Sequence, residues 1–149
     1  MTHYDIVTVE RQTTAVVKAH VAFADLPETE RSARTKLAAA LPKLNAGPAG
    51  DTFTLSRMPS DGKLYIEPGV IVAQTFNADG DVVPSELPAG RAVRHLLIGP
   101  FEQLPQAWPA LFAWSREQGH ALEGRFWQVY GQTAADPAKQ ETTLYALLA

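Results

Sequence analysis

Two short stretches of the chain carry residue types that could bind a small molecule. In KLYIEPG, Tyr65 and Glu67 alternate with apolar residues, and in RFWQVYG the alternating residues are Phe126, Gln128 and Tyr130. Because successive side chains of a strand point to opposite faces, each set is expected to share one face of its strand. If both faces point into one cleft, they form an aromatic box with one carboxylate and one amide, which suits a flat, partly cationic ligand.

A structural interpretation of the same residues is also open: the aromatic rings fill the core, and Glu67 is a solvated residue before a turn. Trp108 can be interpreted in both ways, because it lies on an apolar helical stripe and would either line the cleft or fill the core. Trp114 lies off that stripe by about a third of a turn and is expected to be buried for structural reasons.

Signals for metal and cofactor chemistry are absent from the sequence. Cysteine is missing altogether, and the four histidines have no metal-ligand spacing. The sequence contains no H-E-x-x-H, G-x-S-x-G, P-loop or G-x-G-x-x-G motif. We therefore expect neither a metal nor a cofactor.

Length and charge narrow the class of protein. A chain of 149 residues is expected to form one domain over residues 1–149. The formal net charge is −3 and no stretch is rich in Lys or Arg, so direct nucleic-acid binding is not expected. The longest apolar run, residues 107–114, is far below the ~18 residues that a membrane span requires, and MTHYDIVTVE lacks the features of a signal peptide. We expect a soluble cytoplasmic protein without membrane contact.

The motif F-x-x-L-P occurs twice, at residues 23–27 and 101–105, with an offset of 78 residues. Each copy follows a β-prone segment and precedes an apolar pattern of helical spacing. In the first half, Asp25 and Glu28 predict a capping box at the start of the helix. The apolar stripe of that helix is Ala33, Leu37, Ala40, Leu41 and Leu44, while Arg31, Arg34 and Lys36 lie off the stripe.

The remaining elements follow the same order in both halves. We expect strands over residues 6–9 and 13–23, a hairpin from 52–58 and 63–73 around a turn at 59–62, and a linker over 77–90. The second half has an expected strand at 91–98, a helix ending near Gly119, and strands at 125–131 and 142–148.

This repetition predicts an α+β fold with an internal repeat at roughly 13–76 and 89–149. Each repeat is a strand–helix–strand–strand module that is too small to close a core alone. Two modules related by a pseudo-twofold axis would form one mainly antiparallel curved sheet with both helices on one face. The seam between the modules is then the expected ligand cleft.

The segment LPAGRAVRHLLIGPFEQLPQAWPALFAWSREQG, Leu87 to Gly119, resembles the GyrI-like family, the effector-binding domain also found fused to AraC-type and MerR-type DNA-binding regions. WQVYGQTAADP and TTLYALL match the segments that follow in that family. The resemblance covers roughly the whole chain. It implies a small-molecule-binding domain, in which multidrug-sensing members use an acidic pocket residue to recognise lipophilic cations.

The chain departs from the family pattern at two positions. Gln128 stands where the family often has Glu, and Leu97 stands where it often has His. Glu67, in YIEPG, is the second candidate for the acidic residue.

Three functions are compatible with the sequence. The first is a stand-alone module that holds amphipathic or aromatic molecules in the cleft between the repeats. The second, implied by the resemblance, is a hydrolase of cyclopropane-bearing DNA-alkylating compounds with Glu67 as general acid or base. The third is a protein-binding module whose partner is DNA gyrase or a regulator. The sequence does not specify the natural ligand or the oligomeric state.

Overall fold

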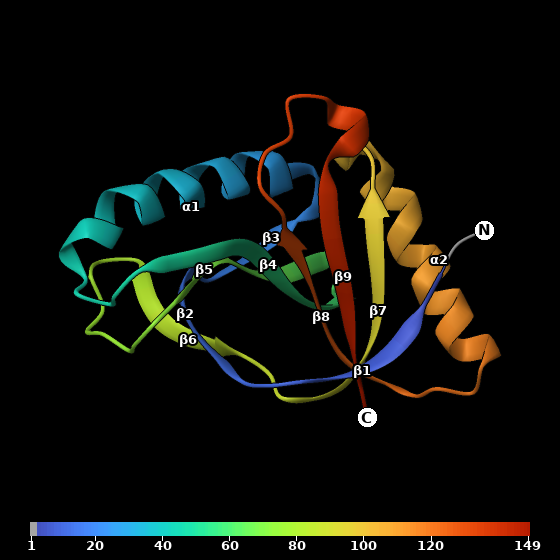
Figure 1. The fold of residues 1–149 in the computed structure, drawn as a ribbon. Coiled ribbons are helices and arrows are strands. Elements are labelled where there is room, and N and C mark those ends of the chain that lie inside the picture. Colours follow the sequence, from blue (N-terminus) through green and yellow to red (C-terminus); the bar gives the residue numbers. More distant parts are fainter. Residues whose placement is uncertain (1–2) are drawn as a thin grey trace.

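The structure, a computed structural model, describes residues 3–149 and has an α+β architecture. Two helices, α1 (Leu26–Ala40) and α2 (Leu104–Glu117), accompany one sheet of nine strands among the described residues. The strands are β1 (Asp5–Val9), β2 (Gln12–Val17), β3 (Ala19–Ala22), β4 (Ala49–Ser60), β5 (Lys63–Val72), β6 (Val82–Leu87), β7 (Gly90–Ile98), β8 (Leu122–Tyr130) and β9 (Glu141–Leu148). The predicted fold class is confirmed, and Figure 1 shows its arrangement.

The order of the strands in the sheet is symmetric. It runs β1-β7-β9-β8-β4-β5-β2-β6, with β3 added beside β5, and every pairing is antiparallel. The order reads the same backwards when β1 is exchanged with β6, β2 with β7, β4 with β8 and β5 with β9. Two strand–helix–strand–strand modules placed side by side produce this order, with the β4·β8 pair at the seam. The repeat boundaries at 13–76 and 89–149 stay a prediction.

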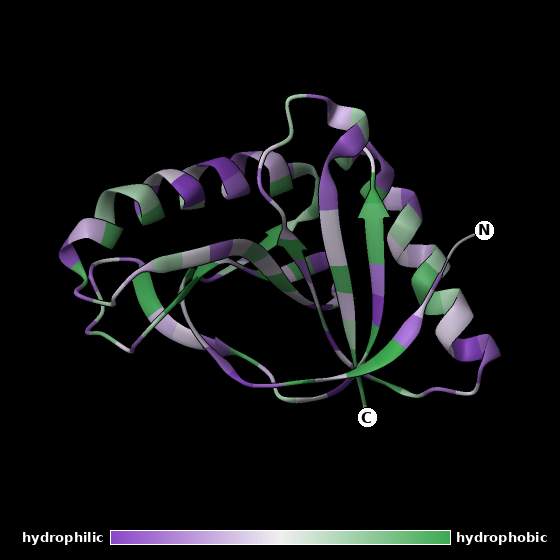
Figure 2. Ribbon diagram, viewed as in Figure 1, coloured by the Kyte–Doolittle hydropathy of each residue, from purple (hydrophilic) through white to green (hydrophobic). Residues whose placement is uncertain are grey.

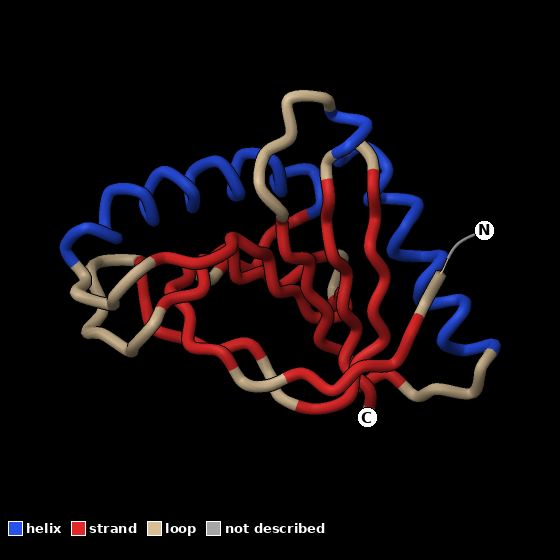
Figure 3. The backbone as a smooth tube through the Cα atoms, in the orientation of Figure 1, coloured by secondary structure: helices blue, strands red, loops and turns tan. Residues whose placement is uncertain are grey.

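Both helices lie on the same face of the curved sheet, one over each half (Figure 3). They are amphipathic, with hydrophobic and hydrophilic residues alternating around each helix (Figure 2). A core cluster under α1 contains Leu37 and Val70, and a second under α2 contains Val93 and Leu111. No helix within residues 3–149 is long and apolar enough to cross a membrane.

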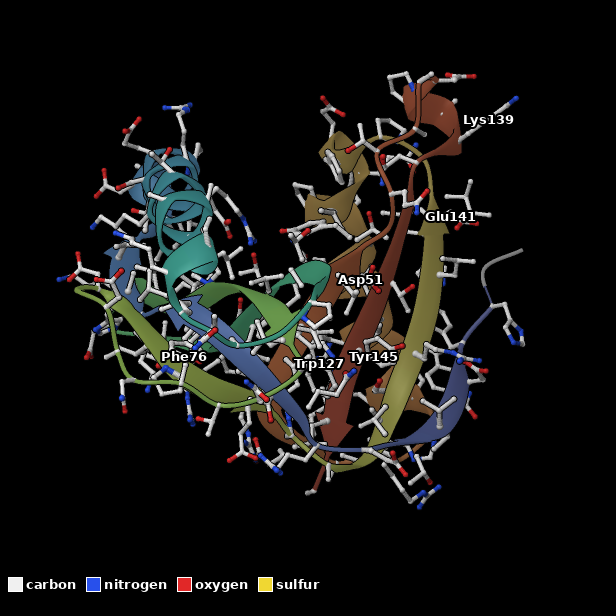
Figure 4. The ribbon with its side chains drawn as sticks, turned by 60° about the vertical axis from the view of Figure 1, so that its left-hand side comes forward. Asp51, Phe76, Trp127, Lys139, Glu141 and Tyr145 are labelled. Carbon is white, nitrogen blue, oxygen red and sulfur yellow. The ribbon has the colours of Figure 1, made fainter. Side chains whose placement is uncertain are left out.

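A third core cluster, which includes Phe53, Leu87 and Trp127, fills the opposite face of the sheet, where neither α1 nor α2 packs. Trp127 of β8 is 3% exposed and stacks on Tyr145 of β9, with 5.3 Å between ring centroids. Figure 4 shows the two rings side by side. Trp127 therefore faces away from the helices, while its neighbours Phe126 and Gln128 face towards them.

The two F-x-x-L-P copies form the same local structure. In each, a short 3-10 helix, η1 (Phe23–Asp25) or η3 (Phe101–Gln103), runs directly into the α-helix, with proline in the first helical turn. The predicted capping box is wrong, because Asp25 makes no capping hydrogen bond. Its φ and ψ of −93° and −2° lie near the helical region, whereas a capping residue needs an extended backbone.

Two other expectations about elements are corrected. The stretch 77–90, expected to be a linker, contains β6, which pairs with β2 along Gln12–Val17. Pro84 is tolerated within β6 because this strand lies at the edge of the sheet. The expected strand 13–23 is divided into β2 and β3, and its last residue, Phe23, belongs to the 3-10 helix η1.

Candidate functional site

A cavity of about 950 Å³ lies between the two helices, over the seam of the sheet. Its walls come from α1 and α2 and its floor from β4, β5 and β8. This volume lies at the upper end of the roughly 300–1,000 Å³ that is typical of small-molecule sites. The lining is predominantly apolar, with a small number of polar side chains.

The repeated motif forms the matching ends of the two walls. The leucine and the proline of each F-x-x-L-P copy line the cavity. The phenylalanines, Phe23 and Phe101, also line it and are 52% and 49% exposed. Large apolar side chains that are half exposed at a cavity are available for contact with a ligand. Phe101 additionally packs against the Tyr130 ring in a T-shaped arrangement, with 5.7 Å between centroids.

The wall formed by α2 is aromatic. Trp108 and Phe112 lie one turn apart on the helix and stack with 5.6 Å between ring centroids. Phe126, on β8, packs against both, at 4.8 Å from Trp108 and 5.3 Å from Phe112. These three rings form a surface on which a planar apolar group can stack.

The wall formed by α1 has charged side chains at the positions that are equivalent, in the repeat, to the aromatic residues Trp108 and Phe112 of α2. Glu30 and Arg34 lie 78 residues before Trp108 and Phe112, the same offset as the repeated motif. Both charged side chains line the cavity, and a distance of 3.4 Å separates Arg34 Nη2 from Glu30 Oε2. The two halves of the cavity therefore differ in chemistry although they share a backbone plan.

A chain of hydrogen bonds crosses the cavity floor from α2 to α1. Trp108 Nε1 donates to Gln128 Oε1 (2.8 Å), and Gln128 Nε2 donates to the Tyr130 hydroxyl (2.8 Å). The Tyr130 hydroxyl lies 3.1 Å from Thr54 Oγ1, which donates to Glu30 Oε1 (2.7 Å). Because the indole N–H can only donate, Gln128 presents its oxygen to Trp108. The single hydroxyl proton of Thr54 goes to the Glu30 carboxylate, so Tyr130 is the donor in its bond with Thr54.

The pKa of the Tyr130 hydroxyl lies above its usual value. Burial is the main cause that raises the pKa of this hydroxyl, and the negative charge of Glu30 raises it further. Tyr130 therefore stays protonated at neutral pH and can donate. The Gln128 amide has a partner at each end within the chain, so its orientation is set by the protein rather than by a ligand.

The structure brings four of the six candidate residues together. Trp108, Phe126, Gln128 and Tyr130 all line the cavity. Their contribution to ligand binding stays a prediction. Trp114 does not line the cavity; its ring stacks on Tyr4, with 5.0 Å between centroids.

Tyr65 and Glu67 do not line this cavity, which corrects the expectation that they share a cleft with Gln128. On β5 the residues that line it are Leu64 and Ile66, so the side chains of Tyr65 and Glu67 lie on the other face of the sheet. Alternation shows which residues share a face, but it does not show which face the helices cover. Glu67 is 5% exposed and accepts hydrogen bonds from the Tyr65 and Ser85 hydroxyls, both at 2.7 Å.

A Glu67→Gln substitution is therefore expected to change stability and not ligand binding. The amide keeps both hydroxyl partners but replaces two charge-assisted hydrogen bonds by neutral ones, so we expect the free energy of unfolding to fall by about 1 kcal/mol. Urea unfolding measures that change, and titration with an aromatic ligand measures affinity. A weaker affinity with unchanged stability would contradict this placement of Glu67.

Glu30 and Arg34 are not among the site residues predicted from the sequence, because Arg34 lies off the apolar stripe of its helix and neither residue is part of a recognisable motif. The signal that could have found them is the repeat itself, which aligns them with two aromatic residues of α2. Within residues 3–149, no three His, Asp or Glu side chains cluster as a metal site would require.

The chain belongs to the family described as the GyrI-like small molecule binding domain, which matches residues 2–147. The family assignment made from the sequence is confirmed. No curated protein gave a significant match.

Several solved structures share the fold. The EcmrR C-terminal domain is 18% identical, with a TM-score of 0.83 and coverage of 100% of this chain and 98% of that one. SAV2435 bound to tetraphenylphosphonium is 14% identical, with a TM-score of 0.70 and coverage of 99% and 94%. A hydrolase from Listeria innocua is 11% identical, with a TM-score of 0.59 and coverage of 98% and 91%. At these identities the likeness shows the fold alone.

Proposed function

We propose that this chain holds a flat, amphipathic aromatic molecule in the cavity between α1 and α2. The observation that carries the proposal is the cavity itself, about 950 Å³ in volume, with an aromatic wall on one side and a charged wall on the other. Such a site can stack the apolar part of a ligand on Trp108 and Phe126 and meet its polar part at α1.

The comparisons support the proposal in a general way. The family is one of small-molecule-binding domains, and a structural neighbour, SAV2435, was solved with tetraphenylphosphonium, an aromatic cation. We infer that a ligand of this chain is also rich in aromatic carbon. In the proposed role the domain passes its ligand state to a protein partner such as a regulator; binding to gyrase is the separate protein-binding alternative that the sequence resemblance implies.

Tryptophan fluorescence tests the proposal. Of the three tryptophans, Trp108 lines the cavity and stacks on other rings, while Trp114 and Trp127 do not line it. A flat aromatic ligand is expected to change the emission in a saturable way in wild type and in Trp114→Phe, and much less in Trp108→Phe. A response that survives in Trp108→Phe and disappears in Trp114→Phe would place the ligand outside the cavity.

A hydrolase is the second candidate, because one carboxylate does line the cavity. That carboxylate belongs to Glu30 and not to Glu67, the residue expected from the sequence. Glu30 would take a proton from water as its oxygen bonds to a cyclopropane carbon. The ring carbon–carbon bond at that carbon would break, its electron pair would stay on the substrate, and Glu30 would return the proton there. Product formation from a cyclopropane-bearing compound, measured by mass spectrometry and lost in Glu30→Gln, would favour the enzyme over simple binding. Intact substrate after prolonged incubation with wild type would reject it.

A further inference from the structure

The ion pair on the α1 wall has a consequence for which ligands the cavity accepts. We propose that Glu30 recognises a positive charge on the ligand and that Arg34 is a built-in competing cation that limits this preference. This inference rests on the proposed function, because it concerns the same cavity. It assigns charge selectivity to α1 rather than to Gln128 or Glu67.

Glu30 has unused capacity to accept hydrogen bonds. Its side chain is 28% exposed and lines the cavity, and Oε1 accepts from Thr54 at 2.7 Å. Oε2 lies 3.4 Å from Arg34 Nη2, which is longer than the roughly 2.7–2.9 Å of a charge-assisted hydrogen bond. A carboxylate can accept about four hydrogen bonds, so a ligand ammonium group can be accommodated at Oε2.

Arg34 is held in place by groups other than Glu30. Its Nη1 donates to the carbonyl of Gly69 at 2.8 Å, and its Nη2 donates to the carbonyl of Phe53 at 2.6 Å. Nη2 also donates to Thr54 Oγ1 at 3.1 Å. The guanidinium is therefore anchored to the backbone of the sheet, and its positive charge stays beside the cavity whether or not a ligand is present.

Arg34 also occupies an aromatic face that a ligand cation could otherwise use. The guanidinium carbon lies 5.6 Å from the centroid of the Tyr130 ring, within the range of a cation–π contact. A cationic ligand near Glu30 therefore competes with Arg34 for the Glu30 carboxylate and for the face of the Tyr130 ring. Removal of the Arg34 charge should strengthen cation binding, and removal of the Glu30 charge should weaken it.

Neither of the other two candidate polar residues can take this role. Gln128 is neutral, and both ends of its amide have partners in the hydrogen-bond chain. Glu67 lies on the other face of the sheet, with Tyr65 and Ser85 as its partners. Among the lining residues of the described chain, Glu30 is the single acidic one.

Three probes of the same shape separate charge from stacking: 1-pyrenemethylammonium, 1-pyrenemethanol and 1-pyrenecarboxylate, titrated with the pyrene emission as signal. For Glu30→Gln we expect an affinity for the cation about tenfold lower, as for loss of a partly buried charge contact. For Arg34→Gln, whose amide can still donate to the sheet, we expect the cation to bind about tenfold more tightly and the anion more weakly. The neutral alcohol should change less than about twofold in both variants.

The matched control is Glu28→Gln, which removes the same charge from an exposed position near the start of α1 that does not line the cavity. Its affinities should equal those of wild type. Equal losses for cation and alcohol in Glu30→Gln, or the same loss of cation affinity in Glu28→Gln, would overturn the inference while the binding function stands. If none of the three probes binds to wild type saturably, the proposed function fails and the inference with it.

Discussion

A Gly69→Ala substitution is expected to lower the free energy of unfolding by about 3 kcal/mol, because overpacking of a filled core displaces backbone. A Cβ atom at position 69 would lie 2.6 Å from the Ala15 carbonyl oxygen, 2.6 Å from Val16 Cγ1 and 2.8 Å from Phe53 Cζ. These neighbours are a backbone atom and two fully buried side chains, so none can move freely. Urea unfolding followed by circular dichroism measures the change.

Gly50→Ala is the matched control, in the partner strand of the same hairpin. A Cβ at position 50 would meet its nearest atoms, which belong to Ile71, at 3.4 to 3.7 Å, an ordinary packing distance. We expect its stability to stay within about 0.5 kcal/mol of wild type. Equal stability of the two variants would show that β5 does not approach β2 as closely as the structure has it.

The second large effect is expected for Ser56→Phe. This substitution should lower the affinity for aromatic ligands at least about 30-fold, which is ~2 kcal/mol of binding free energy. Ser56 lies on β4, lines the cavity floor and pairs with Phe126 on β8. A phenyl ring at this position would occupy space that the ligand needs. The fold should survive, because an apolar cavity of about 950 Å³ has room for the ring. Isothermal titration calorimetry with 1-pyrenemethanol measures the loss.

Arg57→Phe provides the comparison for that experiment. Arg57 is the next residue along β4 and is exposed, and its side chain lies on the other face of the sheet, over the Tyr65 ring. The same aromatic ring is added there without entering the cavity, so we expect the ligand affinity to change less than about twofold. Similar losses in Ser56→Phe and Arg57→Phe would contradict the location of the site.

Most helices and strands could be predicted from the sequence, because the spacing of apolar residues and the positions of proline depend on the conformation of the same segment. The helical spacing of Ala33, Leu37 and Ala40 reflects the face that α1 buries, and all three are buried. The Leu41-Pro42 step marks the end of α1, which the structure places at Ala40. The strand β6 could not be recognised from the sequence, because Pro84 and the surrounding turn residues are more typical of a loop than of a strand. Its place in the sheet is set by pairing with β2, and a local pattern does not record pairing partners.

The site was harder to predict than the fold, since it depends on which face of the sheet the helices cover. Phe126, Gln128 and Tyr130 are on the cavity side, whereas Tyr65 and Glu67 lie on the other side, and period-2 alternation alone treats both sets alike. The internal repeat supplies part of this information, because it shows which residues of the two helices occupy equivalent positions.

The alignment of Glu30 with Trp108 follows from the offset of 78 residues that the motif defines. Trp108 is a candidate from its apolar stripe, so the same offset could also have pointed to Glu30, its counterpart on α1. The hydrogen-bond chain that joins the two residues depends on β4 and β8 being neighbours, with Thr54 opposite Gln128. That register is a property of the folded sheet and no pattern in either strand specifies it.

The most direct test of the cavity as the ligand site uses methionine methyl groups. The sequence contains two methionines, Met1 and Met58, and Met58 lines the cavity with 40% of its surface exposed. In protein labelled with ¹³C-methyl methionine, assigned through Met58→Leu, addition of 1-pyrenemethanol should shift the Met58 resonance in a saturable way and give nuclear Overhauser effects to the pyrene protons. Saturable binding by calorimetry with an unchanged Met58 resonance would contradict the account.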